Sequence, residues 1–126
     1  MTKEQSEKVK LALDILNKLP KEVNPRIGGS CALFMYGDVD NFDDIDIIVD
    51  SLVGVDLEYE RLYLKHPYRL NGTKSYKVGN YKVDLHESIM PKASGILEPK
   101  ENIYCCQRLL KRFFYIVYKE EVNKWN

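Results

Sequence analysis

The sequence predicts an α/β (α+β) fold in which a small mixed β-sheet is flanked by helices. Three observations predict this class: helical and strand patterns alternate through the first half, a hairpin signal follows, and a long helical pattern closes the chain. At 126 residues, of which 44% are hydrophobic, the chain has the size and apolar content of one globular unit. We therefore expect residues 1–126 to form a single domain.

The first helix is expected from Thr2 to Leu19. Thr2 and Gln5 have the spacing of a capping box, in which each residue satisfies a backbone N–H of the other. Pro20 ends this helix, and a short strand is expected at Arg26–Gly28. The apolar residues that recur at helical spacing are Val9, Ala12, Leu13 and Leu16.

A glycine turn leads from that strand into a second helix, which is expected over Ser30–Tyr36. Gly28 and Gly29 permit a tight turn, and Gly37 suits the position just after a helix. A helix that begins at Ser30 directs its free N–H groups and the positive end of its dipole outward, where a phosphate is bound well.

The segment Ile45–Val49 is nearly all β-branched and apolar, so it is predicted to be a central, buried strand. The polar loop 38–43 precedes it and faintly resembles an EF-hand. Asp43 and Val49 stand where that loop needs Gly and Glu, so we exclude this type of calcium site. After the strand, Val55–Lys65 is expected to form a helix.

The middle of the chain is expected to form three further strands. Tyr68–Leu70 and Ser75–Val78 are separated by the turn Asn71-Gly72. Gly79-Asn80 then has the composition of a two-residue hairpin turn, which leads into a strand over Tyr81–Glu87.

A loop is expected over residues 90–98, and a last helix from Pro99 to Glu121, because proline suits the first helical turn. Its predicted core stripe consists of Ile103, Cys106, Leu110, Phe113 and Val117. Another face carries Arg108, Lys111, Arg112 and Tyr115. That face is either solvated or a contact for a phosphate-bearing ligand such as a triphosphate, for RNA or for a protein partner.

The composition limits the environment and partners of the chain. Nineteen basic and nineteen acidic residues cancel, so no global field attracts nucleic acid or membrane. No apolar run approaches the ~18 residues of a membrane span, and the first residues are too polar for a signal peptide. We expect a cytoplasmic protein without a membrane partner. Cys31, Cys105 and Cys106 lack the Cys-x-x-Cys spacing and are interpreted as reduced, mostly buried residues rather than zinc ligands.

The candidate chemistry lies in three carboxylates. Asp44 and Asp46 are two positions apart, so on a strand they point to the same side, where their repulsion is offset by a divalent cation. A carboxylate such as Asp46, followed by a buried apolar run, must be paired or liganded. Asp84 lies within another apolar strand pattern, and its alternative role is an ion pair with Lys77 or Lys82.

Two glycines and a serine, then Asp-x-Asp, then a later lone Asp resemble the nucleotidyltransferase superfamily that includes DNA polymerase β, and most closely its minimal members. The resemblance covers residues 27–85, about half of the chain. It implies a nucleotidyltransferase core, with Asp44, Asp46 and Asp84 as catalytic, metal-binding residues. It also implies that Gly28, Gly29 and Ser30 bind the β- and γ-phosphates of a nucleoside triphosphate. One departure is Asp43, which stands where small members often have Ser or Arg.

The same resemblance implies a reaction and its partners. Two divalent cations, Mg²⁺ or Mn²⁺, would assist transfer of a nucleoside monophosphate from the triphosphate to an acceptor hydroxyl. The acceptor is left open among a small molecule, a protein side chain and an RNA end. Minimal nucleotidyltransferases of toxin–antitoxin pairs modify or restrain a partner protein, so a protein partner is a further expectation.

Several alternatives stay open at this point. The whole fold is alternatively a non-catalytic nucleotide- or partner-binding module, such as an antitoxin-like regulator. The turn Gly28–Ser30 is alternatively a structural turn with a helix N-cap. His86 shares the side of Asp84 and is either a surface histidine or the edge of the site. Glu87 is the substitute for the third acid if Asp84 does not serve.

Overall fold

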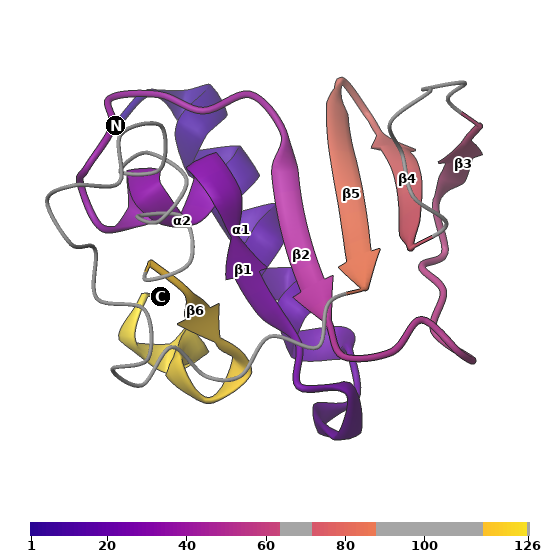
Figure 1. Ribbon diagram of the computed structural model, residues 1–126. Coiled ribbons are helices and arrows are strands. Elements are labelled where there is room, and N and C mark those ends of the chain that lie inside the picture. Colours follow the sequence, from indigo (N-terminus) through magenta and orange to yellow (C-terminus); the bar gives the residue numbers. More distant parts are fainter. Residues whose placement is uncertain (64–71, 88–114, 126) are drawn as a thin grey trace, which may run out of the picture.

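The computed structural model describes residues 1–63, 72–87 and 115–125, which form a six-stranded mixed sheet with helices beside it (Figure 1). The helices are α1 (Lys3–Lys18) and α2 (Gly29–Met35), and the strands are β1 (Arg26–Gly28), β2 (Ile45–Val49), β3 (Glu60–Leu62), β4 (Thr73–Val78), β5 (Tyr81–Glu87) and β6 (Val117–Tyr118). The strand order is β3-β4-β5-β2-β1-β6. Strands β2 and β5 are parallel, and the other neighbours are antiparallel. The predicted α/β class is therefore confirmed.

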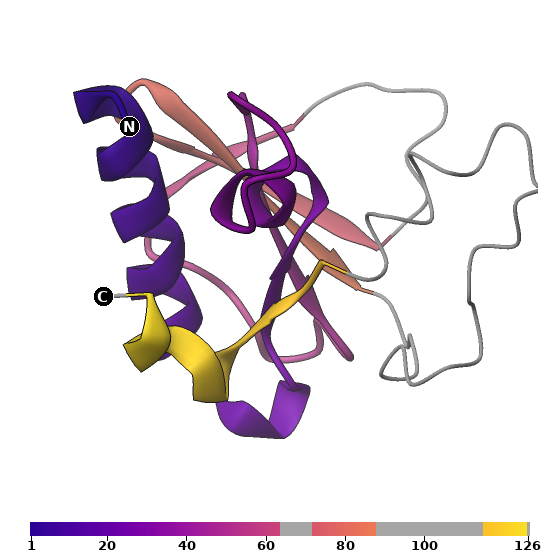
Figure 2. The same cartoon turned by 90° about the vertical axis from the view of Figure 1, so that its left-hand side faces the viewer.

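Helix α1 begins as the sequence predicts. The backbone N–H of Gln5 donates to the Thr2 hydroxyl at 3.1 Å, and the Thr2 N–H donates to the Gln5 side chain at 2.9 Å. Ala12, Leu13 and Leu16 are buried as expected. The sequence did not indicate the burial of Lys8, whose ammonium donates to the carbonyl of Phe42 and lies over its ring. Figure 2 shows α1 lying along one face of the sheet.

The sheet face that packs with α1 is mainly apolar. Its fully buried residues come from five strands and are Ile27, Ile45, Ile47, Val49, Tyr76, Val83, Leu85 and Val117. The register places Ile47 of β2 between Ile27 of β1 and Leu85 of β5. Each aliphatic side chain buried in this way contributes about 1.5–3 kcal/mol. The predicted central position of Ile45–Val49 is confirmed.

Helix α2 is short and ends at a glycine, as predicted. Gly37 has φ +82°, in the left-handed region that suits glycine. Its N–H donates to the carbonyl of Phe34 at 3.0 Å, and the N–H of Asp38 donates to that of Leu33 at 2.9 Å. These two bonds form a Schellman motif, which satisfies carbonyls at the end of the helix. The turn aims the following loop toward the start of β2.

The helix expected over Val55–Lys65 is wrong in its described part. The chain is irregular as far as residue 59 and then forms β3, which pairs antiparallel with β4. The N–H of Leu57 donates to the Asp56 carboxylate at 2.8 Å and to the Tyr76 hydroxyl at 3.3 Å. These side chains offer the backbone an alternative to a helical ladder. The pairing with β4 then makes β3 the edge strand of the sheet.

The last predicted helix is wrong at its end. Val117–Tyr118 forms β6, paired with β1, and a 3₁₀ helix follows over Lys119–Lys124. Val117 is fully buried as expected, but as a strand residue opposite Ile27. The Lys119 ammonium donates to the carbonyls of Asn17 and Leu19 at the end of α1. A long-range strand pairing therefore prevails over the local helical pattern.

The hairpin between β4 and β5 is confirmed. Val78 and Tyr81 are partners across the two-residue turn, in which Gly79 has φ +62°. The predictions for Tyr68–Leu70, for Asn71, for the loop at 90–98 and for residues 99–114 of the last helix lie outside the described residues. Within residues 1–63, 72–87 and 115–125, none of the helices has the length and apolar character needed to cross a membrane.

Candidate functional site

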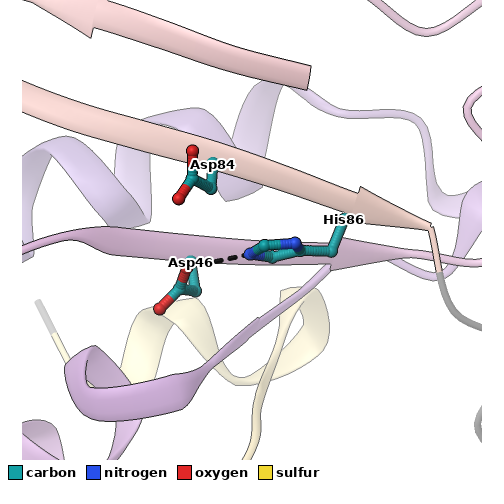
Figure 3. A group of neighbouring side chains, drawn as sticks. All are labelled: Asp46, Asp84 and His86. Atoms are coloured by element: carbon teal, nitrogen blue, oxygen red, sulfur yellow. Dashed lines mark hydrogen bonds and ion pairs between the residues drawn. The ribbon is translucent and has the colours of Figure 1, made fainter. Parts of the chain in front are cut away.

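Two carboxylates lie side by side on the central parallel strands (Figure 3). Asp46 of β2 and Asp84 of β5 are partners in the register. Their flanking residues, such as Ile47 and Leu85, are buried in the core. Because side chains alternate along a strand, the two carboxylates project from the opposite face of the sheet. Two acids that are far apart in the sequence thus meet on a rigid platform.

His86 completes a group of three on the same face. It follows Asp84 by two positions on β5, so the alternation directs its ring to the acid-bearing side. Its Nε2 lies 2.9 Å from Oδ1 of Asp46, and its Nδ1 lies 3.1 Å from the hydroxyl of Thr73 on β4. One ligand atom from each of Asp46, Asp84 and His86 lies within 4.8 Å of the other two. The described parts of the chain contain no other such trio of His, Cys, Asp or Glu.

Asp84 is almost completely buried, with 4% of its surface exposed. A buried carboxylate needs compensating partners, and two neighbours supply them. The Ser75 hydroxyl donates to Oδ1 at 2.5 Å, and the Lys82 ammonium lies 3.5 Å from Oδ2. The ion pair with Lys82, which was the alternative role for Asp84, is therefore present. Lys82 thus pairs with Asp84, whereas His86 is the partner of Asp46.

Asp44 lies apart from the group of three. It precedes β2 by one residue, its side chain is 45% exposed, and Oδ2 lies 3.7 Å from the ammonium of Lys82. Lys82 therefore contacts both Asp44 and Asp84 and lowers the repulsion between them. The structure brings Asp46 and Asp84 together directly, and it joins Asp44 to them through a lysine.

The glycine turn contacts one of the acids. Gly29 has φ +60°, and a Cβ at this position would lie 2.4 Å from Oδ2 of Asp46. A Cβ on Gly28 would lie 2.6 Å from the Ile48 side chain. The positive φ and this close approach together favour glycine at position 29, and Gly29 brings the backbone against the Asp46 carboxylate. The N-cap expected within the turn Gly28–Ser30 is Gly28, which has no side chain to form a capping bond, and the Ser30 hydroxyl does not take this role.

Cys31 lies in the first turn of α2 and is fully buried. Burial, together with the nearby negative charge of Asp46, raises the pKa of its thiol from 9.0 to about 12. A buried thiol with a raised pKa is a poor nucleophile at neutral pH. The predicted buried, reduced state of Cys31 is confirmed, whereas Cys105 and Cys106 lie outside the described residues.

The residues around the acids were only partly foreseen. His86 was expected on the side of Asp84, but its contact with Asp46 depends on the parallel pairing of β2 with β5. Ser75 and Thr73 were not singled out. The predicted Gly79-Asn80 hairpin contained a usable signal, because its register pairs Ser75 with Asp84 and Thr73 with His86. Counting outward from a two-residue turn would have identified both hydroxyls.

No protein-family model matches the chain, and neither a curated protein nor a solved structure matches it significantly.

Proposed function

We propose that this protein has a nucleotidyltransferase-like core and transfers a nucleoside monophosphate from a nucleoside triphosphate to an acceptor hydroxyl. The single observation that carries this proposal is the pairing of Asp46 with Asp84 on adjacent parallel strands, with the Gly29 backbone against Asp46. Gly29, Asp46 and Asp84 follow the order of the superfamily motif in the sequence. Their proximity in the fold supports a shared site.

The residues of the cluster fit a divalent cation. Carboxylate oxygens are ligands for Mg²⁺ and Mn²⁺, and the adjacent charges of Asp46 and Asp84 repel each other unless a cation lies between them. Asp46 and Asp84 would hold the cation, and Asp44, which precedes β2 and is joined to the group through Lys82, would extend the set toward the triphosphate. A bound divalent cation supplies charge neutralisation on the phosphates and on the leaving pyrophosphate.

The chain's own groups have separate roles in this reaction. Asp84 accepts the proton of the acceptor hydroxyl, while the hydrogen bond from Ser75 fixes the orientation of its carboxylate. The acceptor oxygen bonds to the α-phosphorus as the bond to the bridging oxygen breaks, and pyrophosphate leaves. Gly28, Gly29 and Ser30 are the proposed contacts of the β- and γ-phosphates. The acceptor is a small molecule, a protein side chain or an RNA end.

A second candidate function is a non-catalytic nucleotide- or partner-binding module on the same fold. The specific observation that favours it is Lys82, whose ammonium lies within 4 Å of both Asp44 and Asp84. A built-in cation between two acids compensates their charge without a bound metal. In this alternative the acids stabilise the sheet and shape a surface, as in an antitoxin-like regulator that contacts a protein partner.

The two candidates are separated by pyrophosphate release. The full chain is incubated with each nucleoside triphosphate and Mg²⁺ or Mn²⁺, with and without cell extract as a source of acceptors. We expect release by the wild type and a loss of at least ~100-fold in Asp84→Asn, because a positioned proton acceptor is removed at nearly constant volume. The matched control is Asp14→Asn, an exposed position on α1. Equal release by Asp84→Asn, or none under any condition, would contradict transfer by this site.

A further inference from the structure

We propose that His86 is the third ligand of the cation site formed with Asp46 and Asp84, and that the site prefers a first-row transition dication to Mg²⁺. The inference rests on the cation-binding role of the two acids in the proposed function. It replaces an all-oxygen site with a site of two carboxylates and one imidazole. Neither the acid motif nor the alternation along the strands requires a nitrogen ligand, so the evidence comes from the contacts of His86.

The first evidence is the size of the cluster. Metal–ligand bonds to carboxylate oxygen and imidazole nitrogen are about 2.0–2.2 Å long, so ligand atoms on one cation lie about 3–4 Å apart. The three candidate atoms of Asp46, Asp84 and His86 lie within 4.8 Å of one another. The spacing of the three atoms is therefore close to that of ligands on one cation.

The second evidence is the hydroxyl behind the imidazole. Metal-binding histidines usually donate their other ring N–H to a neighbouring acceptor, which fixes the ring and its tautomer. The Thr73 hydroxyl lies 3.1 Å from Nδ1, while Nε2 faces Asp46 at 2.9 Å. A hydroxyl can both donate and accept. When Nε2 donates to Asp46, the Thr73 hydroxyl can donate to Nδ1. When Nε2 offers its lone pair to a cation, the same hydroxyl can accept from the Nδ1 N–H.

The third evidence is the support of the buried acid. The Ser75 hydroxyl donates to Oδ1 of Asp84, and Lys82 lies beside Oδ2. Asp84 and His86 thus each have a neighbour on β4, paired in the register as Ser75 with Asp84 and Thr73 with His86. Ligating carboxylates and histidines in metal sites are held by such hydrogen bonds from a surrounding layer of residues.

The ligand set decides the preference among metals. Oxygen-only sites suit Mg²⁺, which gains little from nitrogen ligands, whereas imidazole suits Co²⁺, Ni²⁺ and Zn²⁺. The rising affinity of a nitrogen-containing site from Mn²⁺ through Co²⁺ to Cu²⁺ follows the Irving–Williams order. A site of Asp46, Asp84 and His86 should therefore bind Co²⁺ or Zn²⁺ more tightly than Mg²⁺.

The test uses the full chain without nucleotide. The sequence contains only two histidines, His66 and His86, so ¹⁵N-labelled imidazole signals can be assigned with a single His86→Gln variant. We expect Zn²⁺ to shift the His86 ring nitrogens much further than Mg²⁺ does, because only Zn²⁺ coordinates the imidazole. Cys105→Ser and Cys106→Ser remove two competing thiols from the background, and the remaining thiol, that of Cys31, is fully buried.

Calorimetric titration with Co²⁺ and Mg²⁺ gives the second readout. We expect His86→Gln to weaken Co²⁺ binding at least ~10-fold and to change Mg²⁺ binding by less than about three-fold, because Mg²⁺ is held by oxygen ligands. Thr73→Val keeps the shape of the side chain and removes the hydroxyl, so Co²⁺ binding should fall ~10-fold with the imidazole still present. The matched control, Asp14→Asn, should leave both titrations unchanged.

The outcomes separate this inference from the proposed function. Co²⁺ binding that depends on Asp46 but is equal in wild type and His86→Gln would overturn the histidine ligand and leave nucleotide transfer standing. The absence of Co²⁺ and Zn²⁺ binding would also overturn the proposal that His86 is a metal ligand. Binding through His86, without pyrophosphate release under any condition, would support this metal site and contradict the transferase.

Discussion

The two faces of the β2–β5 strand pair have opposite characters although they share one backbone. On the face toward α1, Ile45, Ile47, Val83 and Leu85 are all fully buried in the apolar core. On the other face lie Asp46, Asp84 and His86, within 4.8 Å of one another. The alternation of a strand places the residues of the two faces at neighbouring positions. The core therefore fixes the geometry of the polar cluster through the same five register pairs.

The difference teaches which kind of stabilisation each face needs. The apolar face is stabilised mainly by burial, and the hydroxyl of its buried Tyr76 is satisfied by donating to Asp56. On the polar face, Asp84 is also nearly buried, but it depends on Ser75 and Lys82 to compensate its charge. A buried charge that needs such partners adds little to stability. Its presence on this face therefore makes the face a strong candidate for function.

The largest effect is expected on the apolar face. Leu85→Ala should lower the free energy of unfolding by about 2–5 kcal/mol, because it removes a fully buried side chain and leaves a cavity. Denaturant unfolding measures this loss. The matched substitution on the polar face, His86→Ala, should cost less than about 1.5 kcal/mol, since it mainly removes hydrogen bonds of a part-exposed ring. Equal costs would break the distinction between the faces.

The next effect concerns the glycine that contacts the polar face. Gly29→Val should cost about 1–3 kcal/mol from its positive φ, and the clash with Asp46 adds to this. It should also damage nucleotide binding if the turn holds phosphates. Ser30→Ala should be close to neutral for stability, because Ser30 is not the N-cap residue of α2. Thermal unfolding and nucleotide titration of both variants provide the measurement, and a stable Gly29→Val that binds nucleotide normally would contradict this account.

A smaller, pH-dependent effect is expected at Tyr76 on the apolar face. Burial, followed by its hydrogen bond to Asp56, raises the pKa of Tyr76 to about 12, and that same hydrogen bond lowers the pKa of Asp56. A raised tyrosine pKa stabilises the folded state below pH 10, and this contribution is lost as the pH rises from 10 to 12. The lowered pKa of Asp56 affects stability in acid instead. Its contribution to the stability of the folded state is lost as the pH falls below about 4.

Tyr76→Phe removes this hydrogen bond and should cost about 1 kcal/mol near neutral pH. It should also flatten the stability profile of the protein between pH 10 and 12, where the phenol of the wild type ionises. Denaturant unfolding at several pH values measures both effects. A variant whose stability falls as steeply as that of the wild type across this range would show that another group dominates.

The elements predicted most accurately are those with local signals. The Thr2–Gln5 capping box, the Gly37 helix end and the Gly79-Asn80 turn each specify a backbone geometry within a few residues. Strands β3 and β6 were missed because each is short and lies at a sheet edge. Their formation depends on distant partners, β4 and β1, and a local periodicity contains no information about such partners.

The candidate site shows the same division. The alternation along β2 and β5 was sufficient to place Asp46, Asp84 and His86 on polar sides of their strands. The distance between Asp46 and His86 depends on the parallel register, which joins segments 40 residues apart. The sequence pattern could not show that Asp44 lies apart from the trio or that Lys82 lies between Asp44 and Asp84. Both facts depend on how the side chains are placed in the fold.

The most direct test of the central claim compares melting temperatures with and without Mn²⁺ plus a nucleoside triphosphate. At a hundred-fold excess over Kd, ligand binding adds about 2.7 kcal/mol to the wild type, a rise of about 10 °C. Asp46→Asn should lose this rise while keeping its melting temperature without ligand, because one of two repelling charges is removed. Asp14→Asn should keep the rise. An equal rise in wild type and Asp46→Asn would contradict the claim that the polar face of the sheet binds the cation.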